Sequence, residues 1–291
     1  MDFNDYAKVD AVNWTLLNQL RLKSPLHYLH AKQHGTPDSP GRQLGRAVHA
    51  LVFEPETFYA TRIITDLDRR GTKEWKALEA ANPDKEIIKR ADMEDVLAQA
   101  EAVRSCPLLA DLLDGGHFEQ TIQWTDPATG LPCKARLDWI NLRTRTIIDL
   151  KGAPTVHPTR FGTICAKQGY HIQIGGHYYD AVRYGLGWEP REVGIVAVEF
   201  DAPHDVAFYT LDDEDLILAQ DERAALMARL KECIDRNEWP GYAAAETEDG
   251  TPIKQRIALP RWAFGYDEDE TDADELEEMG FAHASGEVRA D

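Results

Sequence analysis

The chain has 291 residues, of which 43% are hydrophobic and 29% charged, a composition typical of a globular protein with a substantial core. It has no apolar run of membrane-spanning length and no secretory signal pattern, so we expect a cytoplasmic protein without a membrane partner. The four cysteines are too widely spaced for a zinc knuckle or an iron–sulfur cluster, and we expect them to be free thiols.

The net charge of −19 opposes binding to nucleic acid, but it is unevenly distributed. Residues 266–291 hold eleven acidic side chains and one arginine, a local charge of −10, so the rest of the chain carries −9. This acidic tail is poor in core-forming residues, and we expect it to be disordered. A single folded domain is therefore predicted over residues 1–265. Charge weakens a nucleic-acid hypothesis without excluding it.

The first part of the chain has the patterns of helices. Apolar residues recur at helical spacing, and Ser-Pro pairs mark the first turns of two helices. Arg42, Arg46 and His49, spaced by four and three residues, share one face of the helix that follows Pro40. A basic loop over 66–76 leads into another helix. The predicted helices begin near residues 12, 25, 40, 76, 92 and 107.

Alternating hydrophobic residues then predict strands. The third strand has an apolar centre at Ile147 and Ile148, which indicates a central place in the sheet. A loop with two prolines follows, then helices and further strands. The strands are predicted over 118–125, 131–140, 144–150, 192–200 and 205–211, and the helices near 170–184 and over 216–234.

Charged residues gather at the ends of the second and third strands. Asp149 and Lys151 share one face of a strand because side chains alternate, and Ile148 and Leu150 occupy the other. Asp138 comes within reach of the first face if the two strands pair as a hairpin. Two carboxylates and an ammonium suit a hard, oxygen-ligated cation such as Mg²⁺, but an ordinary charged surface hairpin explains these residues equally well.

The order αβββαβ, with Asp138 and Asp149-Leu150-Lys151, closely resembles the PD-(D/E)XK nuclease superfamily. Within it, the sequence resembles the RecE-type (exonuclease VIII-like) recombination exonucleases of phages and prophages. The resemblance implies an α/β (α+β) restriction-endonuclease-like core with a central mixed sheet flanked by helices. Its matching features span about residues 12–242 and include Ser24-Pro25, His27-Tyr28, Gly45, His49, Glu54-Pro55, Gly71, Lys73, Trp75, Glu119, Tyr170-His-Ile-Gln173 and Trp239-Pro-Gly241.

The sequence departs from the family pattern at two positions. Leu137 replaces the proline that often precedes the first aspartate, at no chemical cost. His177 stands four residues after Gln173, where the helix motif usually has a tyrosine, and Tyr178 and Tyr179 follow it. The helix is expected to be shifted locally, so Gln173 transfers more directly than any one tyrosine.

The resemblance implies a metal site. Asp138, Asp149 and the backbone carbonyl of Leu150 are expected to bind Mg²⁺, with Mn²⁺ as a substitute. Glu119 and His49 are expected at the same site. Each has a structural alternative, since Glu119 also fits a solvated strand-edge carboxylate and His49 an ordinary packed histidine.

The resemblance also implies roles in catalysis and substrate binding. Lys151 is expected to position the attacking water and offset charge on the scissile phosphate. Gln173 and Tyr170 are expected to contact the substrate or the water network, or else simply to pack on the sheet. Trp75 is either a base-stacking residue or core. The cations available to DNA phosphates, assigned only as a group, are Arg42, Arg46, Arg69, Arg70, Lys73 and Lys76.

The implied activity is a Mg²⁺-dependent exodeoxyribonuclease that degrades linear double-stranded DNA from its ends, 5′ to 3′, in phage-type homologous recombination inside a bacterial host cell. A ring-like homo-oligomer and a single-strand annealing partner follow from the same resemblance. One alternative is another end-processing nuclease of the superfamily, of which several carry a four-cysteine cluster that this sequence lacks. The other is a catalytically inactive DNA-end or protein-binding module, against which the intact Asp138, Asp149 and Lys151 argue.

Overall fold

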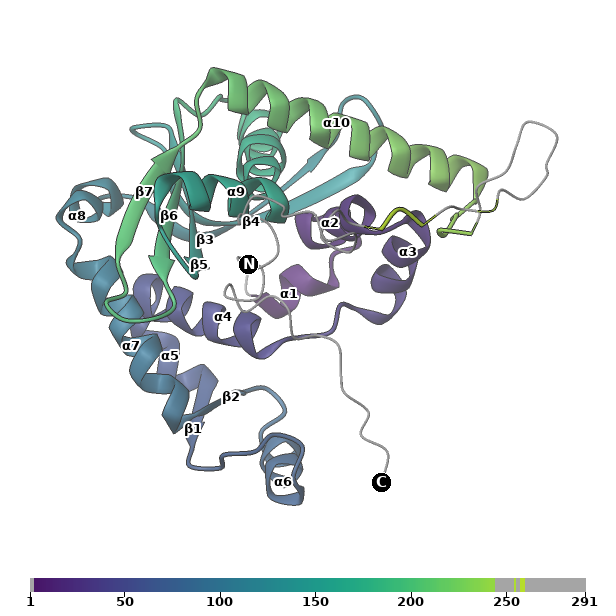
Figure 1. Ribbon diagram of the computed structural model, residues 1–291. Helices are drawn as coiled ribbons and strands as arrows, with labels where there is room; N and C mark the ends of the chain where they lie inside the picture. The colour runs from purple at the N-terminus through teal and green to yellow at the C-terminus, as the bar shows by residue number, and fades with distance from the viewer. Residues whose placement is uncertain (1–2, 244–253, 255–256, 260–291) are drawn as a thin grey trace. The chain divides into compact units, whose positions relative to one another are not determined.

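The computed structural model describes residues 3–243, 254 and 257–259 (Figure 1). The chain divides into two units, Met1–Gly241 and Tyr242–Asp291, and the described helices and strands belong to the first. None of these helices combines the length and the apolar character that a membrane span requires. The acidic tail at 266–291 lies outside the described residues, so a single domain ending at residue 265 stays a prediction.

A mixed five-stranded sheet lies at the centre of the first unit, as the described residues show it. The strands follow one another in the order β3-β4-β5-β6-β7, so β5 is central as predicted. β5 and β6 run parallel and the other neighbours antiparallel, which confirms the mixed sheet. The strands are β3 His117–Thr125, β4 Pro132–Asn141, β5 Thr146–Ala153, β6 Glu192–Glu199 and β7 Val206–Thr210.

Helices cover both faces of this sheet (Figure 1). On one side α4 (Pro40–Phe53) contacts β5, and α7 (Arg90–Ser105) contacts β6. On the other, the π-helical segment η1 (Ile172–Tyr178) lies between the sheet and α10 (Asp213–Arg236). The remaining helices are α1 Phe3–Lys8, α2 Trp14–Leu22, α3 Pro25–His34, α5 Pro55–Thr61, α6 Lys73–Ala81, α8 Pro107–Leu113, α9 Pro158–Gln168 and η2 Ala181–Leu186.

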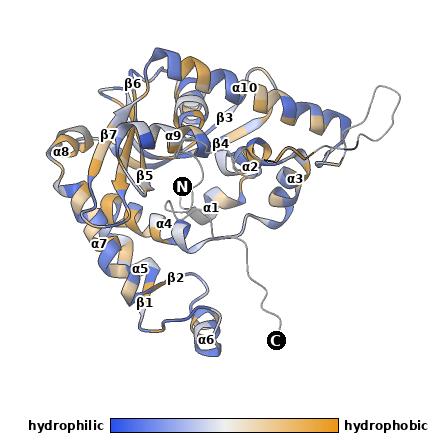
Figure 2. Cartoon of the chain, in the orientation of Figure 1, coloured by the Kyte–Doolittle hydropathy of each residue, from blue (hydrophilic) through white to orange (hydrophobic). Residues whose placement is uncertain are grey.

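An apolar core joins the sheet to α4 and α7. Ile148 and Leu150 of β5 pack there with residues such as Val48 and Val96, and each is at most 4% exposed. A fully buried aliphatic side chain of this size contributes about 1.5–3 kcal/mol. Hydrophobic colour accordingly gathers on the sheet strands in Figure 2, while long stretches of α10 are hydrophilic. The core fixes one face of β5, so Asp149 and Lys151 must project from the other.

Three local features differ from the sequence-based expectation. The loop expected after residue 152 contains a helix, α9, which begins at Pro158, ends at Gln168 and is capped by Gly169 in the left-handed conformation. The helix expected over 170–184 is wound as two π-helical segments. A second, two-stranded parallel sheet of β1 (Arg62–Thr65) and β2 (Glu86–Lys89) was not predicted.

Arg223 of α10 ties the elements behind the sheet together. Its side chain is 3% exposed, and its Nη1 lies 2.9 Å from Asp126, in the turn after β3, and 2.6 Å from Asp180, at the start of η2. A buried charge is tolerated only when it is paired and hydrogen-bonded. Arg223 therefore fixes α10 against the segment that follows η1.

The Arg223→Met substitution is expected to lower the free energy of unfolding by about 3–5 kcal/mol, because it leaves two partly buried carboxylates without their cation. Urea unfolding followed by circular dichroism measures the change. Arg229→Met, at an exposed position of the same helix, is the matched control and should change stability by less than about 0.5 kcal/mol. Equal effects of the two substitutions would contradict this role for Arg223.

Candidate active site

The site begins where β4 and β5 stop pairing. Their register runs from Asn141↔Thr146 to Trp139↔Ile148, and the next opposed positions are Asp138 and Asp149. There the backbone N–H of Leu150 donates to Oδ2 of Asp138 over 2.9 Å, so a side chain takes the place of the neighbouring strand. The two carboxylates therefore lie beside an opening in the sheet.

His49 of α4 reaches this opening from the helical side. Its Nε2 lies 2.8 Å from the carbonyl oxygen of Leu150, and its Nδ1 lies 3.3 Å from Oδ2 of Asp138. Burial lowers the pKa of His49, but the Asp138 carboxylate outweighs it, and the net shift is upward. Burial likewise raises the pKa of Asp138, and His49 with Lys151 turns the net shift downward. Each of the two groups therefore favours the charged form of the other.

Glu119 of β3 faces Asp138 in the strand register, between the pairs Phe118↔Trp139 and Gln120↔Leu137. Its φ of 51° is unusual for a residue with a side chain and costs about 1–3 kcal/mol, and such strain concentrates at functional sites. Ligand atoms of His49, Glu119 and Asp138 all lie within 4.8 Å of one another. Burial, and then the charge of Asp138, raise the pKa of Glu119.

Arg136, a residue that the sequence analysis did not select, holds Glu119. Its Nε lies 2.5 Å from Oε2 of Glu119. The signal for it was its place on β4, two residues before Asp138 and therefore on the same strand face. We call His49, Glu119 and Asp138 the metal-type cluster, and Arg136 thus holds one of its members.

Asp149 and Lys151 project together from β5, as the alternation predicts. Lys151 Nζ lies 2.5 Å from Oδ2 of Asp149, and Oδ1 of Asp149 accepts a 3.3 Å hydrogen bond from Gln173 Nε2. Burial raises the pKa of Asp149, and the carboxylates of Asp149 and Asp138 raise that of Lys151 against its burial. The ammonium also lies 5.0 Å from the ring centroid of Tyr170. Lys151 is therefore a buried cation held beside both aspartates.

The π-helical winding of η1 decides which tyrosine meets Gln173. Gln173 Nε2 donates to the hydroxyl of Tyr178, five residues later, over 2.8 Å. A π-helix pairs residues five apart, so it brings Tyr178 rather than the residue four positions on to the same face. The local shift expected from the sequence thus has a definite form.

His177, the residue four positions after Gln173, lies in the core behind the sheet. It is fully buried, its Nε2 lies 3.0 Å from the carbonyl oxygen of Lys134, and its ring packs against Trp124 at 5.0 Å. Burial, and then the charge of Arg223, lower the pKa of His177 to about 3. His177 is therefore a neutral structural residue outside the site.

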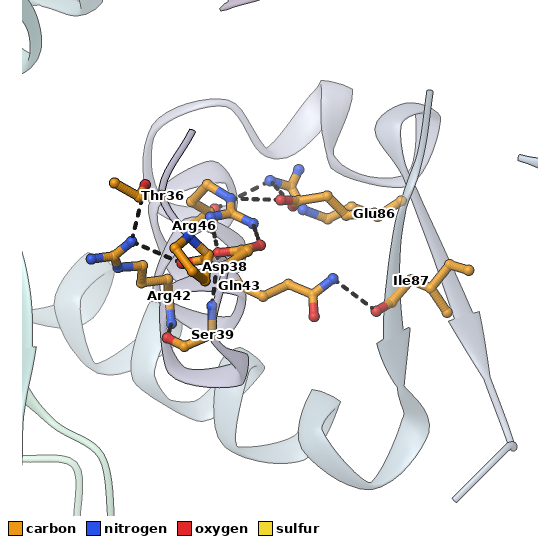
Figure 3. Close-up of polar contacts among 10 residues, drawn as sticks. Thr36, Asp38, Ser39, Arg42, Gln43, Arg46, Glu86 and Ile87 are labelled. Atoms are coloured by element: carbon orange, nitrogen blue, oxygen red, sulfur yellow. Dashed lines mark hydrogen bonds and ion pairs between the residues drawn. The ribbon is translucent and has the colours of Figure 1, made fainter. Parts of the chain in front are cut away.

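The predicted DNA-binding cations differ in whether their charge is free to meet a phosphate. Arg46 is bound by Asp38 at 2.6 Å and by Glu86 at 2.6 Å, so its charge is already neutralised (Figure 3). Arg42, on the same helix, bonds to Pro37 and Thr36 and remains exposed. The expectation of phosphate contacts therefore rests on Arg42 and the 66–76 loop rather than on Arg46.

Within that loop and the start of α6, Arg69, Lys73 and Lys76 are exposed. Arg70 instead stacks over the ring of Trp75 at 5.5 Å. Trp75 itself is 3% exposed and donates its Nε1–H to Glu79, so the base-stacking alternative is wrong and Trp75 is core. A free indole face is needed to stack on a base.

The donor set fits a hard divalent cation. Carboxylates and a backbone carbonyl are oxygen ligands of the kind that Mg²⁺ and Mn²⁺ prefer, and an imidazole adds a nitrogen donor. Asp138, Asp149, Glu119, His49 and the carbonyl of Leu150 would hold the ion. A bound divalent cation supplies an activated water and neutralises charge on an attacked phosphate. When no metal ion is bound, His49 and Lys151 are the basic side chains that lie beside the Asp138 and Asp149 carboxylates.

The buried neutral state of His177 makes stability pH-dependent. The folded pKa near 3 lies below the unfolded value of 6.5, so the unfolded chain takes up a proton first as the pH falls. This group is therefore expected to cost about 2 kcal/mol between pH 7 and pH 5. Urea unfolding at both pH values should show a smaller loss for His177→Gln, and identical losses would refute the assignment.

Comparison with known proteins identifies this arrangement. Residues 15–249 match the family model described as "PDDEXK-like domain of unknown function (DUF3799)". No curated protein sequence gives a match.

One solved structure of similar fold covers most of the chain. This structure, from Eubacterium rectale, carries the name of an exonuclease and superposes with a TM-score of 0.60 at 13% identity, covering 91% of this chain and 97% of its own. A phage-related exonuclease from Haemophilus somnus gives a TM-score of 0.34 at 10% identity over 80% and 99% of the two chains, too low to carry an argument. The family match spans most of the chain, and the residues that resemble the superfamily motif, Asp138 and Asp149-Leu150-Lys151, lie close together in the fold. The chain therefore belongs to the PDDEXK-like family DUF3799, with the fold of the PD-(D/E)XK nucleases.

Proposed function

We propose that this protein is a Mg²⁺-dependent exodeoxyribonuclease of the RecE type, which degrades linear double-stranded DNA from its ends, 5′ to 3′, in phage-type recombination. The observation that carries the proposal is the convergence of Asp138, Asp149 and Lys151 at the opening between β4 and β5. His49 and the Leu150 carbonyl complete an oxygen-rich site of the kind that phosphodiester hydrolysis requires. The 5′-to-3′ direction of digestion and the role in recombination come from the resemblance of the motif to the superfamily.

The residues of the chain divide the chemical work. Lys151 stays protonated, because Asp149 and Asp138 raise its pKa, and so offers a fixed positive charge to the phosphate oxygens as negative charge grows on them. Gln173 holds Asp149 in place through its amide, and Tyr178 holds Gln173. Such support keeps a carboxylate in a productive orientation. Hydrolysis then joins the oxygen of water to phosphorus and breaks one phosphodiester bond.

Assembly and partners form part of the same proposal. A ring-like homo-oligomer would keep the enzyme on DNA between cleavages, and a single-strand annealing protein would receive the strand that digestion leaves. Arg42, Arg69, Lys73 and Lys76 are exposed cations available for sequence-independent phosphate contacts. The net charge of −19 makes such a local set necessary, because the protein as a whole repels DNA.

Purified protein is expected to digest an end-labelled linear duplex in Mg²⁺ or Mn²⁺ and to leave a covalently closed circle of the same sequence intact. EDTA should abolish digestion, because the phosphate then loses the cation that neutralises it. Gel electrophoresis of both substrates provides the measurement. Cleavage of the circle would overturn exonuclease action, and DNA binding without metal-dependent cleavage would favour the inactive binding module.

The Asp149→Asn substitution is expected to reduce Mg²⁺-dependent digestion at least about 10²-fold, since it removes a ligand charge and a partner of Lys151 at once. Isothermal titration with Mn²⁺ should show weaker binding by the same variant. Asp84→Asn, at an exposed position, is the matched control for both assays. Wild-type rates in a folded Asp149→Asn variant would remove Asp149 from the site.

A further inference from the structure

The N-terminal segment, residues 3–12, lies against the strand that carries Asp138, and nothing in the proposed chemistry uses it. We call it the N-terminal strap. Lys134 of β4 holds it: its Nζ donates to the carbonyl oxygens of Tyr6 and Val9, over 2.7 Å each, and lies 4.5 Å from the centroid of the Tyr6 ring. The strap thus closes over a charged residue of the sheet.

These contacts fix the strap firmly. Lys134 is only 3% exposed, and a buried ammonium costs several kcal/mol unless its protons are hydrogen-bonded. The carbonyl ends of a helix are the natural partners of a cation, and α1 directs its last carbonyls at Lys134. A second anchor lies at Val12, whose N–H donates to the carbonyl of Pro132 and whose carbonyl accepts from the N–H of Lys134, both over 2.8 Å. Lifting the strap would expose the ammonium and break these bonds together.

The strap contacts the same face of β4 that carries Asp138 of the metal-type cluster. Lys134, Arg136 and Asp138 alternate along β4 and therefore project from one strand face. Four residues of strand separate Lys134 from Asp138, a distance of roughly 13 Å. Burial raises the pKa of the Tyr6 hydroxyl to about 12, and the charge of Arg136 opposes that rise, so the phenol lies within electrostatic reach of Arg136. The strap and Tyr6 hence occupy the strand face next to Glu119 and Asp138.

We propose that the N-terminal strap is an end stop: it covers the face of β4 beside the metal-type cluster, so that only a strand that terminates there places a phosphodiester at Asp138 and Asp149. This inference rests on the proposed function and names the feature that restricts cleavage to DNA ends. The distance of roughly 13 Å corresponds to about four base-pair rises of 3.4 Å. A continuous strand that followed this face of β4 would have to pass through the position of α1, whereas a terminated strand would stop before it.

The test removes the strap while leaving the cluster untouched. Lys134→Met keeps an apolar stem in the sheet but withdraws the ammonium from the Tyr6 and Val9 carbonyls, and deletion of residues 3–8 removes α1 itself. Both variants are expected to nick a covalently closed duplex circle in Mg²⁺ at least about ten-fold faster than the wild-type protein. Digestion of a linear duplex should continue. Thermal unfolding reports whether each variant is folded.

Two further variants sharpen the result. Tyr6→Ala removes only the ring, at a half-buried position where misfolding is not a concern, and should produce the same nicking to a smaller degree. Lys8→Met is the matched control, because it is the same change from lysine to methionine at an exposed position, where the lysine pairs with Asp5 of its own helix. This variant should leave circles intact.

The outcomes separate this inference from the proposed function. Strap variants that digest linear DNA but still spare circles would overturn the end stop. Faster digestion of linear DNA with intact circles would also overturn it, since the strap would then cover the site for every substrate alike. A wild-type protein without metal-dependent digestion of linear DNA would refute the proposed function itself, which the strap variants cannot do.

Discussion

The hydrogen bond from the Leu150 N–H to the Asp138 carboxylate marks the point where β4 and β5 stop pairing and the candidate site begins. Continued pairing of β4 and β5 would place Asp138 opposite Asp149, and opposed like charges destabilise a sheet. The pairing of the strands ends there, and two basic side chains lie beside the carboxylates, His49 from α4 and Lys151 from β5. These contacts offset the cost of burying the two carboxylates. Each charged group depends on the others, because a lone buried charge is costly.

A chain of close packing supports this group from behind. Gly176 of η1 lies so near α10 that a Cβ would come within 2.7 Å of the Ala219 carbonyl oxygen, so the two elements meet backbone to backbone. Arg223 of α10 then binds Asp126, in the turn after β3, and Asp180, which follows η1. Because η1 is held this tightly, Gln173 has little freedom to leave Asp149. The packing of α10 against η1 thus helps to hold the Asp149 carboxylate in place through Gln173.

Much of the fold was predictable because its signals are local. The alternation of β3, β4 and β5 follows from the pleat of a strand, and the core position of Ile148 forces Asp149 to the other face. What could not be predicted depends on contacts between distant segments or on backbone geometry. Nothing in the sequence around Glu119 announces a φ of 51°, and nothing near Arg46 shows that Glu86 takes up its charge. β1 and β2 are too short, at four residues each, for periodicity to detect. The place of His49 followed from family resemblance alone, and the structure supplies its two bonds.

The winding of η1 has a consequence for how relatives of this chain are compared. Side chains three or four residues apart are neighbours on an α-helix, whereas a π-helix pairs residues five apart. The hydrogen bond between Gln173 and Tyr178 joins residues five apart, so the side chain that meets Gln173 comes one residue later than α-helical spacing predicts. A comparison that counts four residues from Gln173 would therefore select the buried His177 and pass over Tyr178, the residue that bonds to Gln173. Alignment of these proteins should follow spatial correspondence on the helix and not a count of letters.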